Sequence, residues 1–153
     1  MPSDAVPVQI EEVAAGSPEI LAAVGRLVRQ LSASAPAPDA AQLDALLAAG
    51  ATRLLIARDA DRRIVGMLTL AVFPIPTGVR AWIEDVVVDR EARGRGIGAR
   101  LTLAALALAA ADGARSVDLT SRPARAEANR LYERLGFRRR ETNVYRHDGG
   151  PAA

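Results

Sequence analysis

The sequence that most constrains the fold joins three valines, a glycine-rich loop and a long apolar segment. Val86–Val88 is followed by Arg93–Gly98, in which three of the six residues are glycine, and then by Ile97–Ala111. The valines are typical of a strand, and Ile97–Ala111, apolar on nearly every face, is typical of a helix buried against a sheet. Glycines let several backbone N–H groups approach one anion at the positive end of a helix. The pattern therefore predicts a strand–loop–helix unit that binds a phosphate group.

Two kinds of phosphate ligand fit this loop poorly. A nucleoside triphosphate loop ends in Gly-Lys-Ser/Thr, but the chain contains no lysine. A dinucleotide loop fits the spacing of Gly94, Gly96 and Ala99, and Asp118 lies about twenty residues further on. However, a dinucleotide fold normally begins at such a loop and continues through several more strands and helices. Only a few dozen residues follow Ala99, so the position of the loop disfavours this interpretation.

Three motifs together resemble the GNAT superfamily of acetyl-CoA-dependent N-acetyltransferases. Arg93, Gly96 and Gly98 match the Q/R-x-x-G-x-G/A loop of that family. Upstream, Trp82–Asp89 is similar to the family's central strand, and downstream, Asn129–Phe137 is similar to its L-Y-x-x-x-G-F segment. The motifs occur in the family's order and cover the C-terminal half of the chain. The resemblance implies an α+β fold with a mostly antiparallel sheet of six to seven strands, about four flanking helices and a splayed central parallel pair.

Length and periodicity predict how the chain is divided. At 153 residues with 50% hydrophobic residues, the chain is expected to form one domain over residues 1–153, with a disordered tail from about residue 148. Phe73–Gly78 contains two prolines, which cannot donate to a sheet ladder, so it is predicted to be a connecting loop, either a rim of the acceptor site or a plain hairpin connection. The pattern predicts helices over 17–31, 39–48, 97–111 and 124–135, and strands over 6–13, 52–58, 64–72, 82–89, 116–120 and 137–146.

The resemblance also implies which residues hold acetyl-CoA. The backbone of the valine strand would bind the pantetheine arm, and the glycine loop would bind the pyrophosphate. Many relatives carry an asparagine seven residues before the motif tyrosine, but Arg125 occupies that position here. Asn129 either takes over that contact or serves as a capping or packing residue. The cofactor-binding residues implied are Val86, Val87, Val88, Arg93, Gly94, Arg95, Gly96, Ile97, Gly98, Ala99 and Asn129.

Acetyl transfer to an amine needs a base, because an alkyl amine with a pKa near ~10 is protonated at neutral pH. Glu84 matches the acidic position of the family's strand and is the predicted general base, with Asp85 as the alternative. Strand alternation would place these two carboxylates on opposite faces. Tyr132 is the predicted general acid for the departing thiolate, unless its ring only packs beneath the loop. The thioester oxygen would accept a hydrogen bond from the backbone N–H near Val87 or Val88.

Composition excludes several other kinds of chemistry. The chain has no cysteine, so a disulfide or a thiolate nucleophile is impossible, and His147 is the single histidine, which argues against a metal site. The net charge is +2, with no basic block longer than Arg138–Arg140, so a nucleic-acid partner is not expected. Residues 1–8 do not resemble a signal peptide, and the longest apolar stretch, Leu101–Ala111, is too short to span a membrane. The expected location is the cytoplasm, and the abundance of arginine and alanine suggests a bacterial genome.

These patterns lead to one functional hypothesis and two alternatives. The chain is expected to move an acetyl group from acetyl-CoA to a primary amine of a small molecule, in a direct ternary-complex reaction without a metal. The alternatives are acetylation of a protein or peptide amine, and a non-catalytic domain that only binds an acyl-CoA. A homodimer formed through the last strand or through the strand after Gly78 is also plausible on this pattern.

Overall fold

The computed structural model describes residues 7–149, which fall into two compact units. The first, Met1–Thr120, contains a five-stranded sheet and three α-helices among its described residues, and the second, Ser121–Ala153, contains one. We describe each unit by itself. Val6, the predicted start of the first strand, and residues 150–153 of the predicted tail lie outside the described residues.

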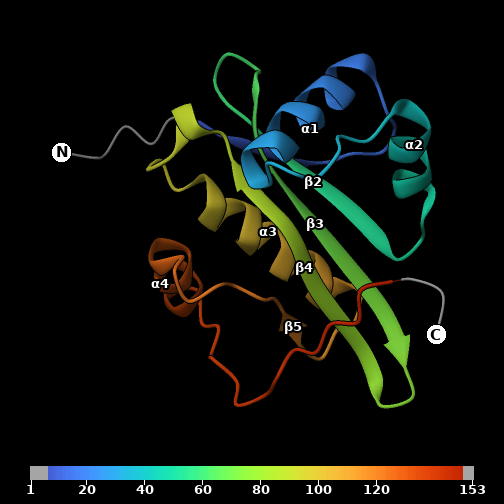
Figure 1. The fold of residues 1–153 in the computed structure, drawn as a ribbon, viewed down its shortest axis with the longest axis vertical. Coiled ribbons are helices and arrows are strands. Elements are labelled where there is room, and N and C mark those ends of the chain that lie inside the picture. The colour runs from blue at the N-terminus through green and yellow to red at the C-terminus, as the bar shows by residue number, and fades with distance from the viewer. Residues whose placement is uncertain (1–6, 150–153) are drawn as a thin grey trace. The chain divides into compact units, whose positions relative to one another are not determined.

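The sheet of the first unit has the order β1-β2-β3-β4-β5 (Figure 1). Its first four strands pair antiparallel, and β4 and β5 pair parallel. This confirms the α+β class and the parallel pair, although the described residues form five strands in place of the six to seven expected. The strands are β1 (Gln9–Glu12), β2 (Thr52–Arg58), β3 (Ile64–Ile75), β4 (Gly78–Val88) and β5 (Val117–Asp118).

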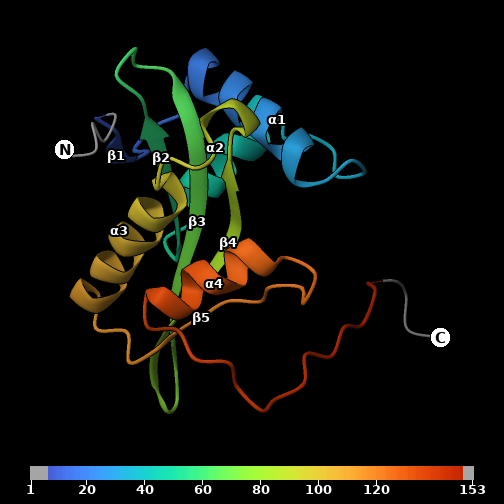
Figure 2. The same ribbon diagram turned by 90° about the vertical axis from the view of Figure 1, so that its left-hand side faces the viewer.

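Helices cover both faces of this sheet (Figure 2). On one side lie α1 (Pro18–Leu31) and α2 (Ala40–Ala48), whose buried leucines and valines join Ile56, Met67 and Val87 in the core. On the other side lies α3 (Ile97–Ala111), buried against β3 as its apolar sequence predicts. Ser17 caps α1, and Asp39 caps α2 through a reciprocal capping box with Gln42.

The structure has the hairpin connection at Phe73–Gly78, but the connecting loop is shorter than predicted, because β3 continues to Ile75 and turns within two residues into β4. Pro74 is tolerated in the strand because of its register. The N–H of Val72 donates to Ala51 beside β2, so alternation directs the nitrogen of Pro74 to that same side. The pairing between β2 and β3 ends at Thr52 and Ala71, and the missing N–H therefore costs no ladder hydrogen bond.

The second unit contains α4 (Ala126–Arg134), somewhat shorter than the helix predicted over 124–135. The predicted strand over residues 137–146 is wrong, since none of these residues pairs with a strand. The segment holds one arginine triplet and few apolar residues, and Val144 and Tyr145 are largely exposed. A sequence of this kind has no apolar face to bury, and a strand outside a ladder leaves its backbone groups unpaired.

Candidate functional site

A β-bulge interrupts β4 immediately after Glu84. Glu84 pairs with Thr69 and Val87 pairs with Met67, so Asp85 and Val86 together stand opposite the single residue Leu68. Asp85 has a φ of +49°, in the left-handed region that few side chains other than those of Asp and Asn adopt readily. The regular alternation that would place Glu84 and Asp85 on opposite faces therefore ends at Glu84.

Beyond the bulge, one edge of β4 is open within the first unit. The only β4 residues paired with β5 are Ala81 and Trp82, in the described part of the chain. The N–H of Asp89 donates to Val65, so the register directs the main chain of Val87 toward β3 and that of Val88 toward the open edge. On that edge the carbonyl of Val88 accepts a hydrogen bond from Nε of Arg93, at 3.3 Å. Of the two oxyanion donors expected, this register favours the N–H of Val88, because that of Val87 faces β3.

Two glycines of the loop adopt a backbone that requires glycine. Gly94 and Gly96 have φ values of +76° and +74°, and no atom within 4 Å would meet a Cβ at either position. The requirement is therefore conformational and not steric. Gly96 is also the N-cap of α3, and it provides no side chain to cap the helix. The first N–H groups of α3, from Ile97 to Ala99, are thus left available to an anion.

A buried carboxylate fixes the start of this loop. Asp89 is 3% exposed, and its side chain accepts a hydrogen bond from the N–H of Glu91 at the start of the short 3-10 helix η1 (Arg90–Ala92). Burial alone would raise the pKa of Asp89, but the hydrogen bonds from Glu91 and Gln30 and the charge of Arg26 outweigh it and hold the pKa below its ordinary value. Asp89 is therefore a charged anchor for the segment between β4 and the glycine loop.

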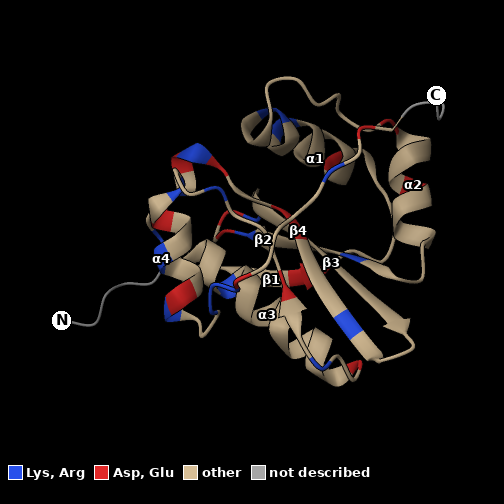
Figure 3. Ribbon diagram, turned by 60° about the horizontal axis from the view of Figure 1, so that its bottom comes forward, with Lys and Arg blue, Asp and Glu red and all other residues tan. Residues whose placement is uncertain are grey.

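Three arginines surround the glycine loop with positive charge. Arg93, Arg95 and Arg100 are exposed, and within residues 7–149 none of them has a carboxylate within 4.0 Å. The rest of α3 carries no charged residue and is tan along most of its length in Figure 3. Positive charge is thus concentrated at the end of α3 where the uncapped N–H groups lie.

Glu84 lies on the face of the sheet that α1 and α2 cover. It pairs with Thr69, two residues along β3 from the core residue Met67, and it is exposed to solvent. Trp82 lies on the same face, and its Nε1 donates a hydrogen bond of 2.9 Å to Oε1 of Glu84. This bond orients the carboxylate while leaving its second oxygen available to a proton on a substrate.

The other two predicted side chains belong to the second unit. Tyr132 is buried, packs edge-to-face on Phe137 with ring centroids 5.7 Å apart, and has a pKa raised by burial, against a smaller lowering by Arg125. Its hydroxyl is therefore a protonated phenol at neutral pH. Nδ2 of Asn129 donates to the carbonyl of Arg122 at 3.2 Å, which ties α4 to the segment before it. Its amide oxygen has no such bond within the described residues.

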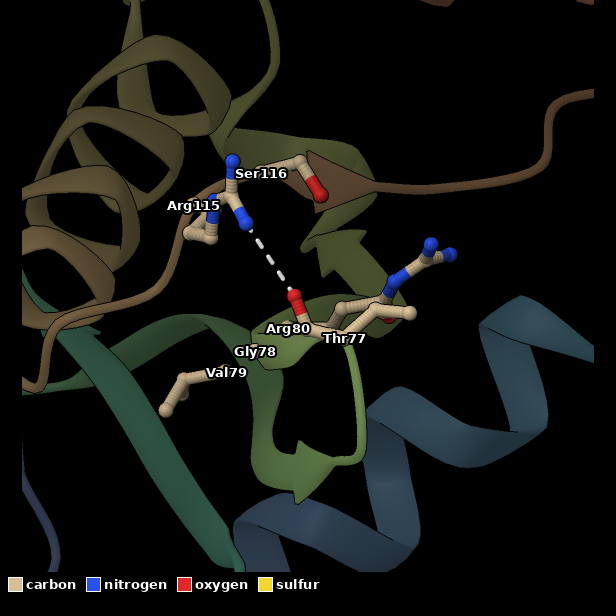
Figure 4. Close-up of a pocket in the computed structure, with 6 residues that line it drawn as sticks. All are labelled: Thr77, Gly78, Val79, Arg80, Arg115 and Ser116. Atoms are coloured by element: carbon tan, nitrogen blue, oxygen red, sulfur yellow. Dashed lines mark hydrogen bonds between the residues drawn. The ribbon is translucent and has the colours of Figure 1, made fainter.

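Sequence reasoning missed a cavity of about 330 Å³ beside the β3–β4 turn. Figure 4 shows its lining, with the Arg115 guanidinium turned toward the turn and the Arg80 guanidinium extending away from it. Nη1 of Arg115 donates to the carbonyl of Thr77 at 3.1 Å. No spacing in the sequence links these segments, because the parallel pairing of β5 with β4 brings them together. The lining residues are Thr77, Gly78, Val79, Arg80, Arg115 and Ser116.

The model of the Acetyltransferase (GNAT) family matches residues 26–137. Over 85 residues the chain is 41% identical to a mycothiol acetyltransferase of Clavibacter michiganensis subsp. michiganensis (strain NCPPB 382). That match covers 56% of this chain and 26% of the relative, so the chain spans about a quarter of that protein's length.

Solved structures of acetyltransferases share the fold. The aminoglycoside acetyltransferase meta-AAC0020, from an uncultured soil metagenomic sample, superposes with a TM-score of 0.81 at 23% identity, covering 93% of this chain and 95% of the other. The ribosomal-protein-alanine N-acetyltransferase of Brucella melitensis biovar Abortus 2308 superposes with a TM-score of 0.75 at 21% identity, covering 94% and 100%. In the described part of the chain, no helix has the length and apolar character needed to cross a membrane.

Proposed function

The chain belongs to the GNAT family of acetyltransferases, and from this we propose that it transfers an acetyl group from acetyl-CoA to a primary amine of a small molecule. The transfer is direct, within a ternary complex, and needs no metal. A covalent acetyl-cysteine intermediate is impossible because the chain has no cysteine.

The observation that carries this proposal is the open edge of β4 beside the glycine loop. The N–H groups from Ile97 to Ala99 and the exposed guanidinium groups of Arg93 and Arg95 suit the pyrophosphate of CoA. The main chain of Val86 and Val88 pairs with no strand on this edge, which suits the amide groups of a pantetheine arm that binds as an added strand would. The thioester would then lie near the bulge, beside Glu84.

Glu84 is proposed to take the proton from the amine, directly or through one water. Its carboxylate is exposed and accepts a hydrogen bond from Trp82, which orients it and leaves the second oxygen available to the amine. The neutral amine nitrogen then forms a bond to the thioester carbonyl carbon. The N–H of Val88 is the proposed donor to the oxygen that becomes negatively charged.

The nitrogen of that intermediate carries one extra proton, which it loses to solvent water to become the amide. Collapse of the intermediate breaks the carbon–sulfur bond, and the thiolate of CoA needs a proton. Tyr132 is proposed to supply it, because its pKa is raised by burial and its phenol is fully protonated at neutral pH. This role supports an enzyme rather than a domain that only binds acyl-CoA. Asn129 is proposed to contact the CoA through its amide oxygen.

The first test is thermal unfolding with acetyl-CoA, NAD or ATP at matched concentrations. A ligand at about one hundred times its Kd adds roughly 2.7 kcal/mol, which corresponds to about 5–10 °C for a chain of this size. We expect such a shift with acetyl-CoA alone, followed by thiol release when amines are added. A shift of the Tm with NAD and not with acetyl-CoA would contradict the proposal. The absence of a shift with every ligand would contradict it as well.

Two glycine variants make the test specific to the loop. Gly96→Glu places a negative charge at the anion site, whereas Gly113→Glu introduces the same side chain at another left-handed glycine with no atom near its Cβ position. Both variants carry similar backbone strain. We expect Gly96→Glu to lose the acetyl-CoA shift and Gly113→Glu to keep it. Equal shifts in the two variants would show that the loop does not bind the CoA pyrophosphate.

A further inference from the structure

Alternate residues of β4 before the bulge form one charged face beside Glu84. Arg80, Trp82 and Glu84 pair in turn with Phe73, Ala71 and Thr69, and the strand is regular over this span. Their side chains therefore lie on the same face of the sheet. Parallel pairing also places Asp118 of β5 beside Trp82 on this face.

Charge changes sign along this face. Arg80 lies at one end, at the cavity beside the β3–β4 turn, Glu84 lies at the other end, and Asp118 lies on the neighbouring strand beside Trp82, between them. A carboxylate pair next to an aromatic ring attracts an ammonium group. An acceptor bound along the face would thus have its amine at Glu84 and a different group at Arg80.

The guanidinium of Arg80 has no partner within the described residues. It is exposed, and it forms neither a salt bridge nor a side-chain hydrogen bond there. In contrast, Arg115 in the same cavity donates to Thr77 and packs its aliphatic chain across Gly78. Arg115 stabilises the turn and adds positive charge, whereas Arg80 is free to bind an anion. The hydroxyl groups of Thr77 and Ser116 supply further donors in that cavity.

We propose that the acceptor is an amine that also carries a carboxylate or phosphate group, and that Arg80 binds this anionic group while the amine lies at Glu84. The proposal rests on the proposed function. Four residues of strand separate the Cα atoms of Arg80 and Glu84 by roughly 13 Å, at about 3.3 Å per residue, so the two groups of the acceptor lie within that span. A polycationic acceptor is disfavoured because Arg80 and Arg115 repel it.

The test compares acceptors that differ in one charge. Thiol release from acetyl-CoA is measured with aminohexanoate and aminooctanoate, and with the neutral amides of the same two acids. We expect kcat/KM to be about tenfold higher for the carboxylates, mainly through KM, as a charge-assisted hydrogen bond to a guanidinium predicts. In Arg80→Gln the carboxylate-to-amide ratio should fall to near one. In Arg62→Gln, which removes the same charge from an exposed turn between β2 and β3, the ratio should stay as in the wild type.

Calorimetry makes the test independent of turnover. Aminohexanoate is titrated into protein saturated with CoA, for the wild type, Arg80→Gln and Arg62→Gln, and we expect binding to weaken by about tenfold in Arg80→Gln alone. Thiol release from every amine without preference for a carboxylate would overturn this inference and leave the proposed function intact. No thiol release from any amine would instead contradict the proposed function. Calorimetry alone would then show whether Arg80 binds the carboxylate of aminohexanoate. Equal binding by the wild type and Arg80→Gln, or the absence of binding, overturns the anionic site.

Discussion

Substitution of Asp85 should invert the usual order of strand preferences. In a regular strand, valine is favoured over alanine, and alanine over glycine, on a scale of about 1 kcal/mol. At Asp85 the φ of +49° reverses the steric argument, since a left-handed backbone costs a side chain with a Cβ roughly 1–2 kcal/mol and costs glycine nothing. A β-branched side chain fits that region worst of all.

The magnitudes follow from the same terms. Asp85→Gly removes the backbone strain from the folded protein, which stabilises it, but it also raises the entropy of the unfolded chain, which destabilises it. We therefore expect the free energy of unfolding to rise by between zero and about 1 kcal/mol. Asp85→Ala should lose up to about 1 kcal/mol, because aspartate tolerates the left-handed region better than alanine. Asp85→Val should lose about 2 kcal/mol or more. For a chain of this length, each kcal/mol corresponds to about 2–4 °C in Tm.

Thermal and urea unfolding of the three variants measures this order, with the same three substitutions at Arg80 as a control. Arg80 lies in the regular part of the same strand and is exposed, so valine should be the most stable there and glycine the least. A protein in which Asp85→Val is as stable as Asp85→Gly would refute the bulge. The main chain of Val86 would then be regular, and the open edge proposed for pantetheine would lose its basis.

Three further predictions concern a helix cap, the general acid and the buried anchor. Asp39→Ala should destabilise the protein by about 1 kcal/mol in urea unfolding by removing the capping box of α2, whereas Asp44→Ala inside the same helix should not. Tyr132→Phe should keep the Tm and lower kcat, and full turnover would remove this hydroxyl from the mechanism. The pKa of Asp89 is depressed in the folded protein, so its contribution to the free energy of unfolding exists above the ordinary aspartate pKa and is lost as pH falls through the folded value. Asp89→Asn should therefore be less stable than the wild type at neutral pH in urea unfolding, and a gap that does not narrow in acid would contradict this.

The sequence was sufficient where the structure depends on local patterns. Ser17 and Asp39 cap helices where their spacing predicted, and β2 has the limits that its apolar run indicated. The glycine loop could be predicted for the same reason, because the left-handed backbone at Gly94 and Gly96 is one that glycine adopts without strain. These features depend on a few neighbouring residues, and their physical causes are visible in the residue types themselves.

Features set by pairing between distant segments could not be predicted in this way. Pro74 looked like a strand terminator, and it is tolerated because the pairing of β2 with β3 stops at Thr52 and Ala71, three residues before Pro74. The cavity at Arg80 likewise exists because β5 returns parallel to β4. Neither fact can be read from the residues concerned, since both depend on where a different strand stops or starts.

The bulge at Asp85 combines the two situations and explains why the base was hard to assign from sequence. Glu84 shares a face with Trp82, because the strand is regular up to that pair. One residue later, the pairing of Leu68 with Leu55 turns the main chain of Leu68 away from β4, and the extra residue is accommodated there. Glu84 is thus the last side chain of β4 before the bulge whose direction the regular register fixes, and it lies next to the backbone groups that the bulge leaves without a partner on β3. A general base must be oriented, and the regular strand up to Glu84 provides this. An acyl donor needs free N–H groups, and the bulge that follows provides them.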